Sequence, residues 1–251
     1  MSPIAVSLIV FACVFGGALL GIFLHASLPQ HHLASESKDI VKLGMGLVGT
    51  MAALVLGLLV ASAKGSYEAQ SAELTHMSAN IALLDRALAL YGPETKETRV
   101  LLRAAVVRIL DQLWSDATSD SSKAPPTSAG GEILYDKIAG LSPKDDLQRS
   151  LRGQALSIAT DIGKTRWLMF EQSITSVSLP LLVVLVLWLS AIFVSFGLFA
   201  PFNGTVVASL FVSALSVSGA IFLILEMYTP FTGIVAVSSA PMRAALAHLG
   251  Q

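Results

Sequence analysis

The side chains most suited to metal binding lie between residues 31 and 39. His31 and His32 are followed by Glu36 and Asp39, and imidazole and carboxylate groups are ligands that transition metals accept. Adjacent histidines point in different directions on most backbones. The chain also lacks the H-E-x-x-H spacing that places two histidines on one face of a helix. The sequence therefore predicts no metal site.

Groups for catalysis or cofactor binding are equally sparse. No G-x-S-x-G turn, no phosphate-binding G-x-x-x-x-G-K-[ST] loop and no dinucleotide-binding G-x-G-x-x-G pattern occurs. Gly44-Met45-Gly46 lies inside an apolar run, so these glycines do not form a phosphate-binding loop. Cys13 is the only cysteine, so an intrachain disulfide is impossible, and we interpret Cys13 as a packing residue. We expect no catalytic residue, no cofactor and no enzyme activity.

The composition indicates a membrane protein. Apolar residues make up 54% of the 251 residues and charged residues only 13%, against roughly 25% charged in a soluble domain. A formal net charge of -1 gives no basic surface for nucleic acid, so we expect no nucleic-acid partner. The lipid bilayer is the predicted surrounding.

Four apolar runs are long enough to cross a bilayer as helices, since a crossing needs about 20 residues. None contains a charged residue, and the first has no Lys or Arg before it, so we interpret it as a retained anchor rather than a cleaved signal peptide. The fold class is therefore all-α and polytopic, with crossings at Ile4–Leu24, Leu43–Ala63, Val177–Ala200 and Thr205–Leu225.

The basic residues indicate the orientation. All Lys and Arg residues except Lys38, Lys42 and Arg243 fall between Lys64 and Arg166, and cytoplasmic flanks of membrane helices carry an excess of positive charge. We expect a plasma (inner) membrane protein with both termini cytoplasmic, although the opposite orientation stays open. The expected parts are two crossings with an outer loop (1–64), a cytoplasmic helical domain (65–173), two crossings (174–228) and a cytoplasmic tail (229–251).

Two apolar stripes predict helices in the central domain. Leu74, Met77, Ile81, Leu84 and Leu88 recur at steps of three and four, and Leu102, Val106, Ile109 and Leu113 do the same. Gly92 is expected to end the first helix. A short helix is expected over Glu132–Ala139, and Ser142 is expected to cap the next one. The first stripe could close the core of its own domain or bind a partner helix.

The second crossing divides into a face of small residues and a face of bulky ones. The small face contains Gly46, Thr50, Ala53, Gly57 and Ala61, and the bulky face contains Leu47, Met51, Leu54 and Leu58. Small faces allow close helix packing, and a helix of this kind could instead line a narrow pore that gates by dewetting. In a pore, Thr50, Leu54 and Gly57 would lie near the narrowest part and Lys64 at the cytoplasmic mouth.

Glu226 is the acid nearest to the membrane, at the end of the fourth crossing. Acids inside a membrane are candidates for function. At this depth Glu226 could equally reach the interface or pair with Arg166 or Arg243.

Four stretches of the chain stand out by their length and spacing. They are Leu56-Gly-Leu-Leu-Val-Ala-Ser-Ala-Lys64, Leu84-Asp-Arg-Ala-Leu-Ala-Leu-Tyr-Gly-Pro-Glu94, Phe196-Gly-Leu-Phe-Ala-Pro-Phe-Asn203 and Ile221–Gly233. Together they resemble a bacterial membrane family known as bestrophin-like domain proteins, and the resemblance covers nearly the whole chain. Tyr228 departs from the pattern, because the family often has an acid there.

This resemblance implies similarity to bestrophins, which are pentameric ion channels with four crossings per subunit, cytoplasmic termini and a pore lined by the second crossing. The leading hypothesis is therefore a homo-oligomeric, pentameric ion channel, with identical subunits and permeating ions as partners. The alternative is a non-conducting membrane scaffold. It would recruit a cytoplasmic protein through the stripe Leu74–Leu88 and the loop Ser115–Gly131.

Overall fold

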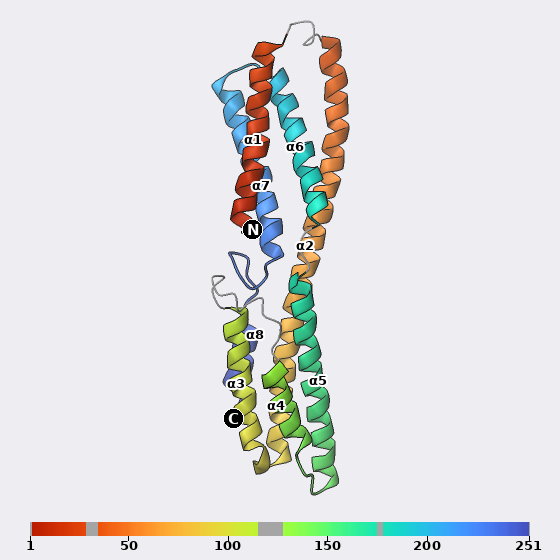
Figure 1. Ribbon diagram of the computed structural model, residues 1–251, viewed down its shortest axis with the longest axis vertical. Helices are drawn as coiled ribbons and strands as arrows, with labels where there is room; N and C mark the ends of the chain where they lie inside the picture. Colours follow the sequence, from red (N-terminus) through yellow and green to blue (C-terminus); the bar gives the residue numbers. More distant parts are fainter. Residues whose placement is uncertain (1, 29–34, 115–127, 175–177, 251) are drawn as a thin grey trace. The chain divides into compact units, whose positions relative to one another are not determined.

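A computed structural model describes residues 2–28, 35–114, 128–174 and 178–250 of the chain. Nearly all of them are helical, and no strand occurs among them. In chain order the helices (Figure 1) are α1 (Pro3–Ser27), α2 (Ser35–Tyr91), the short 3-10 helix η2 (Pro93–Thr95), α3 (Lys96–Leu113), α4 (Ser128–Ala139), α5 (Asp146–Ile174), α6 (Leu179–Phe199), α7 (Gly204–Met227) and α8 (Ala240–His248).

The chain forms two compact units. The membrane unit consists of Met1–Gly65 and Ser176–Tyr228, and the polar unit consists of Ser66–Thr175 and Thr229–Gln251. Helix α2 contributes its first part to the membrane unit and its second part to the polar unit. The predicted tail residues therefore belong to the polar unit.

Four helices of the described chain are long and apolar enough to cross a membrane, namely α1, the first part of α2, α6 and α7. The bounds of α1, α6 and α7 lie within a few residues of the predicted crossings, whereas α2 begins at Ser35, eight residues before the predicted Leu43, and continues to Tyr91. The side chain of Ser2 caps α1 by accepting from the amide of Ala5, and Asn203 caps α7 by accepting from the amide of Val206 at 2.8 Å. The all-helical architecture expected from the sequence is confirmed.

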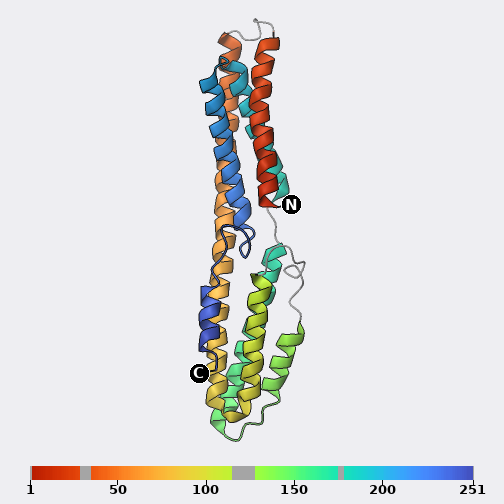
Figure 2. The same cartoon turned by 90° about the vertical axis from the view of Figure 1, so that its left-hand side faces the viewer.

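Within the membrane unit, α1 packs along α6 and α7, as both ribbon views show (Figure 1, Figure 2). Glycines bring α1 and α6 into backbone contact. A Cβ on Gly21 would lie 2.1 Å from the carbonyl oxygen of Val194, and one on Gly197 would lie 2.1 Å from that of Ala18. Small residues allow membrane helices to approach closely, and in this chain α1 and α6 use them in that way.

The apolar stripe of α2 closes the core of the polar unit. All five of its residues are at most 1% exposed: Leu74, Met77, Ile81, Leu84 and Leu88. Leu102, Val106 and Ile109 of α3 are buried in the same cluster, and each such burial contributes about 1.5–3 kcal/mol. The interpretation as an internal core is confirmed. The interpretation of this stripe as a partner surface is wrong, because helices of the same chain already cover it.

The turns of the polar unit follow from local chemistry. Helix α2 ends at Tyr91, and Gly92 then adopts φ +136°, a conformation that favours glycine. Helix α4 begins at Ser128, four residues before the predicted start. Asp145, not Ser142, caps α5, since its carboxylate accepts from the amide of Gln148 at 2.7 Å. The Gln148 side chain in turn accepts from the amide of Lys144. This nearly reciprocal arrangement satisfies two backbone donors.

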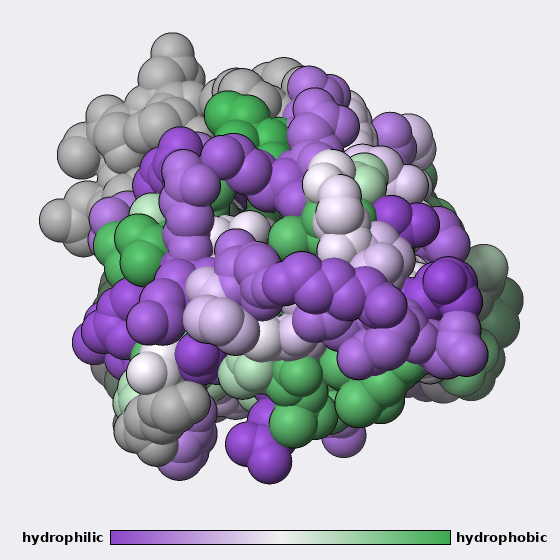
Figure 3. All heavy atoms as spheres, turned by 90° about the horizontal axis from the view of Figure 1, so that it is seen from below, coloured by the Kyte–Doolittle hydropathy of each residue, from purple (hydrophilic) through white to green (hydrophobic). Residues whose placement is uncertain are grey.

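The end of the polar unit that carries these turns is mainly hydrophilic on its surface (Figure 3). Lys144 donates to Glu94 at 2.5 Å, and this hydrogen bond lowers the pKa of Glu94 and raises the pKa of Lys144. Both side chains are exposed, so the pair adds little to stability. A surface of this kind is suited to water rather than to lipid.

Helix α8 and the residues around it complete the core of the polar unit. Met242, Ala245 and Leu249 are buried in the same cluster as the stripe of α2. The indole nitrogen of Trp114 donates to the carbonyl of Val237 at 3.0 Å, and Arg103 donates to the carbonyl of Leu249 at 3.0 Å. The last helix is thus held by both packing and hydrogen bonds.

Candidate pore face on α2

One side of α2 in the membrane unit is not covered by its own chain. Thr50, Leu54, Gly57, Ala61 and Lys64 are all exposed, and Leu54 is 75% exposed. Steps of three and four place them on one side of a helix with 3.6 residues per turn. We call these five residues the α2 face.

The opposite side of α2 packs against the membrane unit. Ala52, Leu59 and Ala63 are at most 4% exposed and belong to the apolar cluster that α1, α6 and α7 share. The predicted bulky residues do not take part in this packing, since Leu47, Leu58 and Leu54 are each more than 60% exposed. Both the small and the bulky face predicted from the sequence are therefore open to lipid, to a second subunit or to a lumen.

The small residues of α2 do not serve packing within the chain. A Cβ placed on Gly46 or Gly57 would meet nothing within 4 Å, in contrast to Gly21 and Gly197 of the α1–α6 contact. The hydroxyl of Thr50 donates to the carbonyl of Leu47 at 2.7 Å, which satisfies its proton within the helix and leaves its lone pairs on the exposed side. Close packing inside one subunit thus does not explain this face.

Glu226 lies in the last turn of α7 and is 4% exposed. It is a buried acid rather than one that reaches out to the interface. Of the two cations considered as its partners, Arg166 donates to the side chain of Gln112 and Arg243 donates to the hydroxyl of Ser239. A pairing of Glu226 with either arginine stays a prediction.

A hydrogen bond between hydroxyls joins the middle of α2 to the residue that follows α7. The Tyr228 hydroxyl lies 3.0 Å from the hydroxyl of Ser62, two residues before Lys64 on α2. The sequence gives Ser62 no role beyond its place in the stretch Leu56–Lys64. The bond ties the α2 face to the segment that follows the fourth crossing.

A crevice of about 630 Å³ opens beside α2 at the other end of the membrane unit. Lys38 and Lys42 line it, together with residues of α6 and α7 such as Phe196 and Val206. The Lys38 ammonium donates to the carbonyl of Phe199 at 3.4 Å and lies 5.9 Å from the centre of its ring. The two lysines that precede Lys64 in the chain thus line the same crevice at one end of the unit.

No group of three His, Cys, Asp or Glu side chains suited to a metal ion occurs among the residues that the structure describes. His31 and His32, considered above as metal ligands, lie outside the described residues.

Comparison with known families decides the relationship. Residues 12–242 match the bestrophin-like domain. The chain belongs to the bestrophin-like family. No curated protein and no solved structure matches it. The match includes most of α1, the other three candidate membrane helices and nearly all of the polar unit, so this bestrophin-like chain is a multi-pass membrane protein.

The bestrophin-like stretches noted in the sequence make structural contacts. The first and the last are joined by the Ser62–Tyr228 bond. The third contains Gly197 of the α1–α6 contact, and its Asn203 caps α7. Leu198, also in the third stretch, offers its carbonyl to the ring of His25, at 2.7 Å.

The second stretch supplies a buried ion pair that the sequence analysis missed. Asp85 is bound by the guanidinium of Arg99 through two hydrogen bonds of 2.7 and 2.8 Å. Its carboxylate also accepts from the amide of Gly250 at 3.3 Å. Hydrogen bonding to Asp85 raises the pKa of Arg99. Asp85 therefore connects α2, α3 and the residues after α8.

Proposed function

We propose that the chain assembles into a homo-oligomeric, pentameric ion channel of a bacterial inner membrane, with α2 lining the pore. The main support for this proposal is the α2 face. It contains exposed small, polar and apolar residues inside a candidate membrane crossing, and it does not pack against its own chain. Membership of the bestrophin-like family favours a channel over other uses of such a face.

The residues of the α2 face have the chemistry that a narrow pore needs. Leu54, repeated around an axis, would form an apolar ring that closes by dewetting. Thr50 would present hydroxyl oxygens one turn away, and Gly57 would leave room on the other side because it has no side chain. Lys64 would place positive charge at the mouth, where it attracts anions. Glu226 would be the acid at the edge of the membrane near this mouth.

The proposed orientation places the polar unit and both termini in the cytoplasm. Its basis is the distribution of Lys and Arg, which gather from Lys64 onward and are almost absent between the other crossings. A tag at either terminus should then be inaccessible to a membrane-impermeant label in whole cells and accessible after lysis. Labelling in whole cells would reverse the orientation.

Ion flux from liposomes tests the channel. The protein with Gly57→Leu should lose most of its flux, because each subunit adds a bulky side chain to the narrow part. Gly219→Leu on α7 is the matched control, since a Cβ there also meets nothing within 4 Å, and it should conduct as the unmodified protein does. Tight liposomes containing folded, unmodified protein would refute the proposal. Equal flux from both variants would refute the role of α2.

The scaffold alternative loses one of its two proposed contact surfaces, since the stripe Leu74–Leu88 is buried. Its other surface, the loop Ser115–Gly131, lies mostly outside the described residues. No observation in the described part of the chain favours it over the channel.

A further inference from the structure

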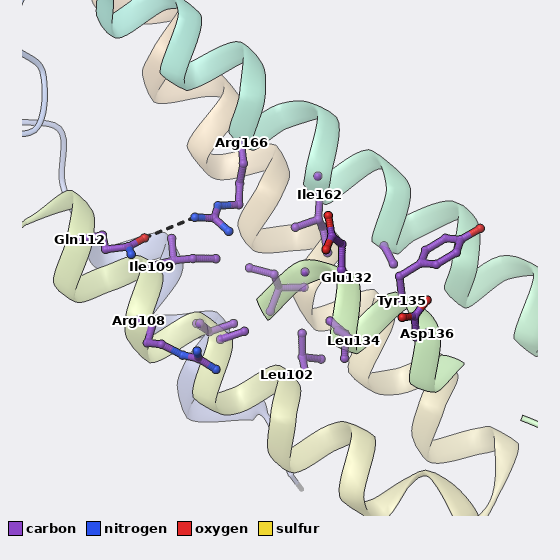
Figure 4. Close-up of a pocket in the computed structure, with 16 residues that line it drawn as sticks. Leu102, Arg108, Ile109, Gln112, Glu132, Leu134, Tyr135, Asp136, Ile162 and Arg166 are labelled. Carbon is purple, nitrogen blue, oxygen red and sulfur yellow. Dashed lines mark hydrogen bonds between the residues drawn. The ribbon is translucent and has the colours of Figure 1, made fainter. Parts of the chain in front are cut away.

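The polar unit contains a partly open cavity of about 260 Å³ that the proposed channel function does not use. Residues of α2, α3, α4 and α5 line it (Figure 4). Its walls are mainly apolar and include Ile81, Leu102, Ile109, Leu134 and Ile162. Small-molecule sites are typically apolar cavities with a few convergent polar groups.

One of the polar groups is a half-buried cation. Arg166 extends from α5 toward α3, where it donates to the side-chain oxygen of Gln112 at 3.3 Å (Figure 4). Within the described part of the chain, no carboxylate lies at ion-pair distance from it. Burial lowers the pKa of Arg166. Since a guanidinium has five N–H donors, most of them remain available to an anion.

The other charged residues of the cavity lie away from Arg166 or in solvent. Asp136 is on the opposite side of the view in Figure 4, and Glu132 and Arg108 are exposed. The charged group that burial penalises most is therefore positive, and a bound anion would compensate it.

A glycine keeps the cavity open. Gly163 lies within α5 and lines the cavity, and a Cβ at this position would meet nothing within 4 Å. Glycine inside a helix costs about 0.5–1 kcal/mol relative to alanine, so its place here is not explained by helix stability. Gly163 and Arg166 line the same cavity.

We propose that this cavity binds a small organic monocarboxylate with an apolar body. Its carboxylate would be held by Arg166 through paired hydrogen bonds, a geometry that guanidinium and carboxylate share. Its apolar body would lie against Ile109, Leu134 and Ile162. The volume lies below the range of about 300–1,000 Å³ for drug-sized ligands, which favours an aryl or short acyl acid over a membrane lipid. Binding at this site does not depend on whether the protein conducts.

Calorimetry with the full chain in lipid nanodiscs tests the proposal, with empty nanodiscs as the blank for partition into the bilayer. The probe is 3-phenylpropanoate, and its neutral analogue is 3-phenylpropanamide. The acid should bind at least about tenfold more tightly than the amide, because a hydrogen bond to a charged group contributes more than a neutral one.

Three variants assign the site. Arg166→Gln should weaken binding of the acid about tenfold or more and leave the amide unchanged. Gly163→Leu should abolish binding of both by filling the space. Arg149→Gln, an exposed change on the same helix, should have no effect. Equal binding of acid and amide, no binding of the acid, or an unchanged preference in Arg166→Gln would each overturn the proposal. Should Gly163→Leu fail to fold, the acid–amide preference of Arg166→Gln still decides.

Discussion

Alanine at Gly21 tests the helix contact on which the membrane unit depends. The new Cβ would lie 2.1 Å from the carbonyl oxygen of Val194 and 2.9 Å from the amide nitrogen of Leu198. Ordinary contact begins at 3.4 Å. Both obstructing atoms belong to the backbone of α6, so no side chain can rotate away and the two helices must separate.

The magnitude follows from two opposing terms. Overpacking costs about 1–3 kcal/mol, and a clash with backbone belongs at the upper end of that range. Replacing glycine by alanine inside a helix returns up to about 1 kcal/mol. The net loss should be about 2 kcal/mol, which corresponds to a fall in Tm of about 4–8 °C for a chain of this size.

Gly16 supplies a control on the same helix. A Cβ there meets nothing within 4 Å, so Gly16→Ala should leave the Tm unchanged or raise it slightly. The assay is thermal unfolding of the purified protein in detergent, followed by the fraction that elutes as a single species after heating. Equal Tm values for Gly21→Ala and Gly16→Ala would refute the close contact between α1 and α6.

Three further changes test other parts of the fold. Asp85→Ala should lower the free energy of unfolding of the polar unit by about 2–4 kcal/mol, since it removes the two charge-assisted hydrogen bonds that the partly buried Arg99 donates to Asp85. Protease cleavage after α8 should accelerate, and an unchanged cleavage rate would contradict the link to Gly250. Met77→Asn should lower the free energy of unfolding by about 3 kcal/mol or more, because it places an amide in the core. The expected readout is loss of folded protein. A variant that folds normally and loses only a binding partner would contradict this and support the scaffold alternative. Tyr228→Phe removes the hydrogen bond to Ser62 and should cost about 0.5–1.5 kcal/mol in the same thermal assay; Tyr135→Phe, an exposed change with no such bond, is its control.

The local features of this fold could be predicted from the sequence because they depend on neighbouring residues. Apolar runs of about 20 residues specify membrane helices, and steps of three and four specify which residues of α2 face the core of the polar unit. Gly92 ends α2 for a reason that lies in its own backbone. The cap of α5 was misassigned because Ser142 and Asp145 are both good caps, and the position of Gln148 relative to each decides between them.

The candidate sites were only partly predictable. The α2 face could be named from spacing, but spacing alone favoured neither close packing nor a pore. The structure shows that Gly21 and Gly197 make the close contact and that Gly57 does not. Both kinds of glycine lie in similar apolar runs, so the difference arises from which helix lies opposite.

The sequence by itself thus determined the number of apolar helices, the approximate extents of α1, α6 and α7, and the stripes that close the polar core. The tertiary structure alone decided which side of α2 stays uncovered, that Asp85 binds Arg99, that Ser62 meets Tyr228 and that Arg166 lines a cavity kept open by Gly163. The physical reason is range. Hydrophobicity, capping and helical period act over a few residues, whereas these contacts join different helices and depend on how those helices pack.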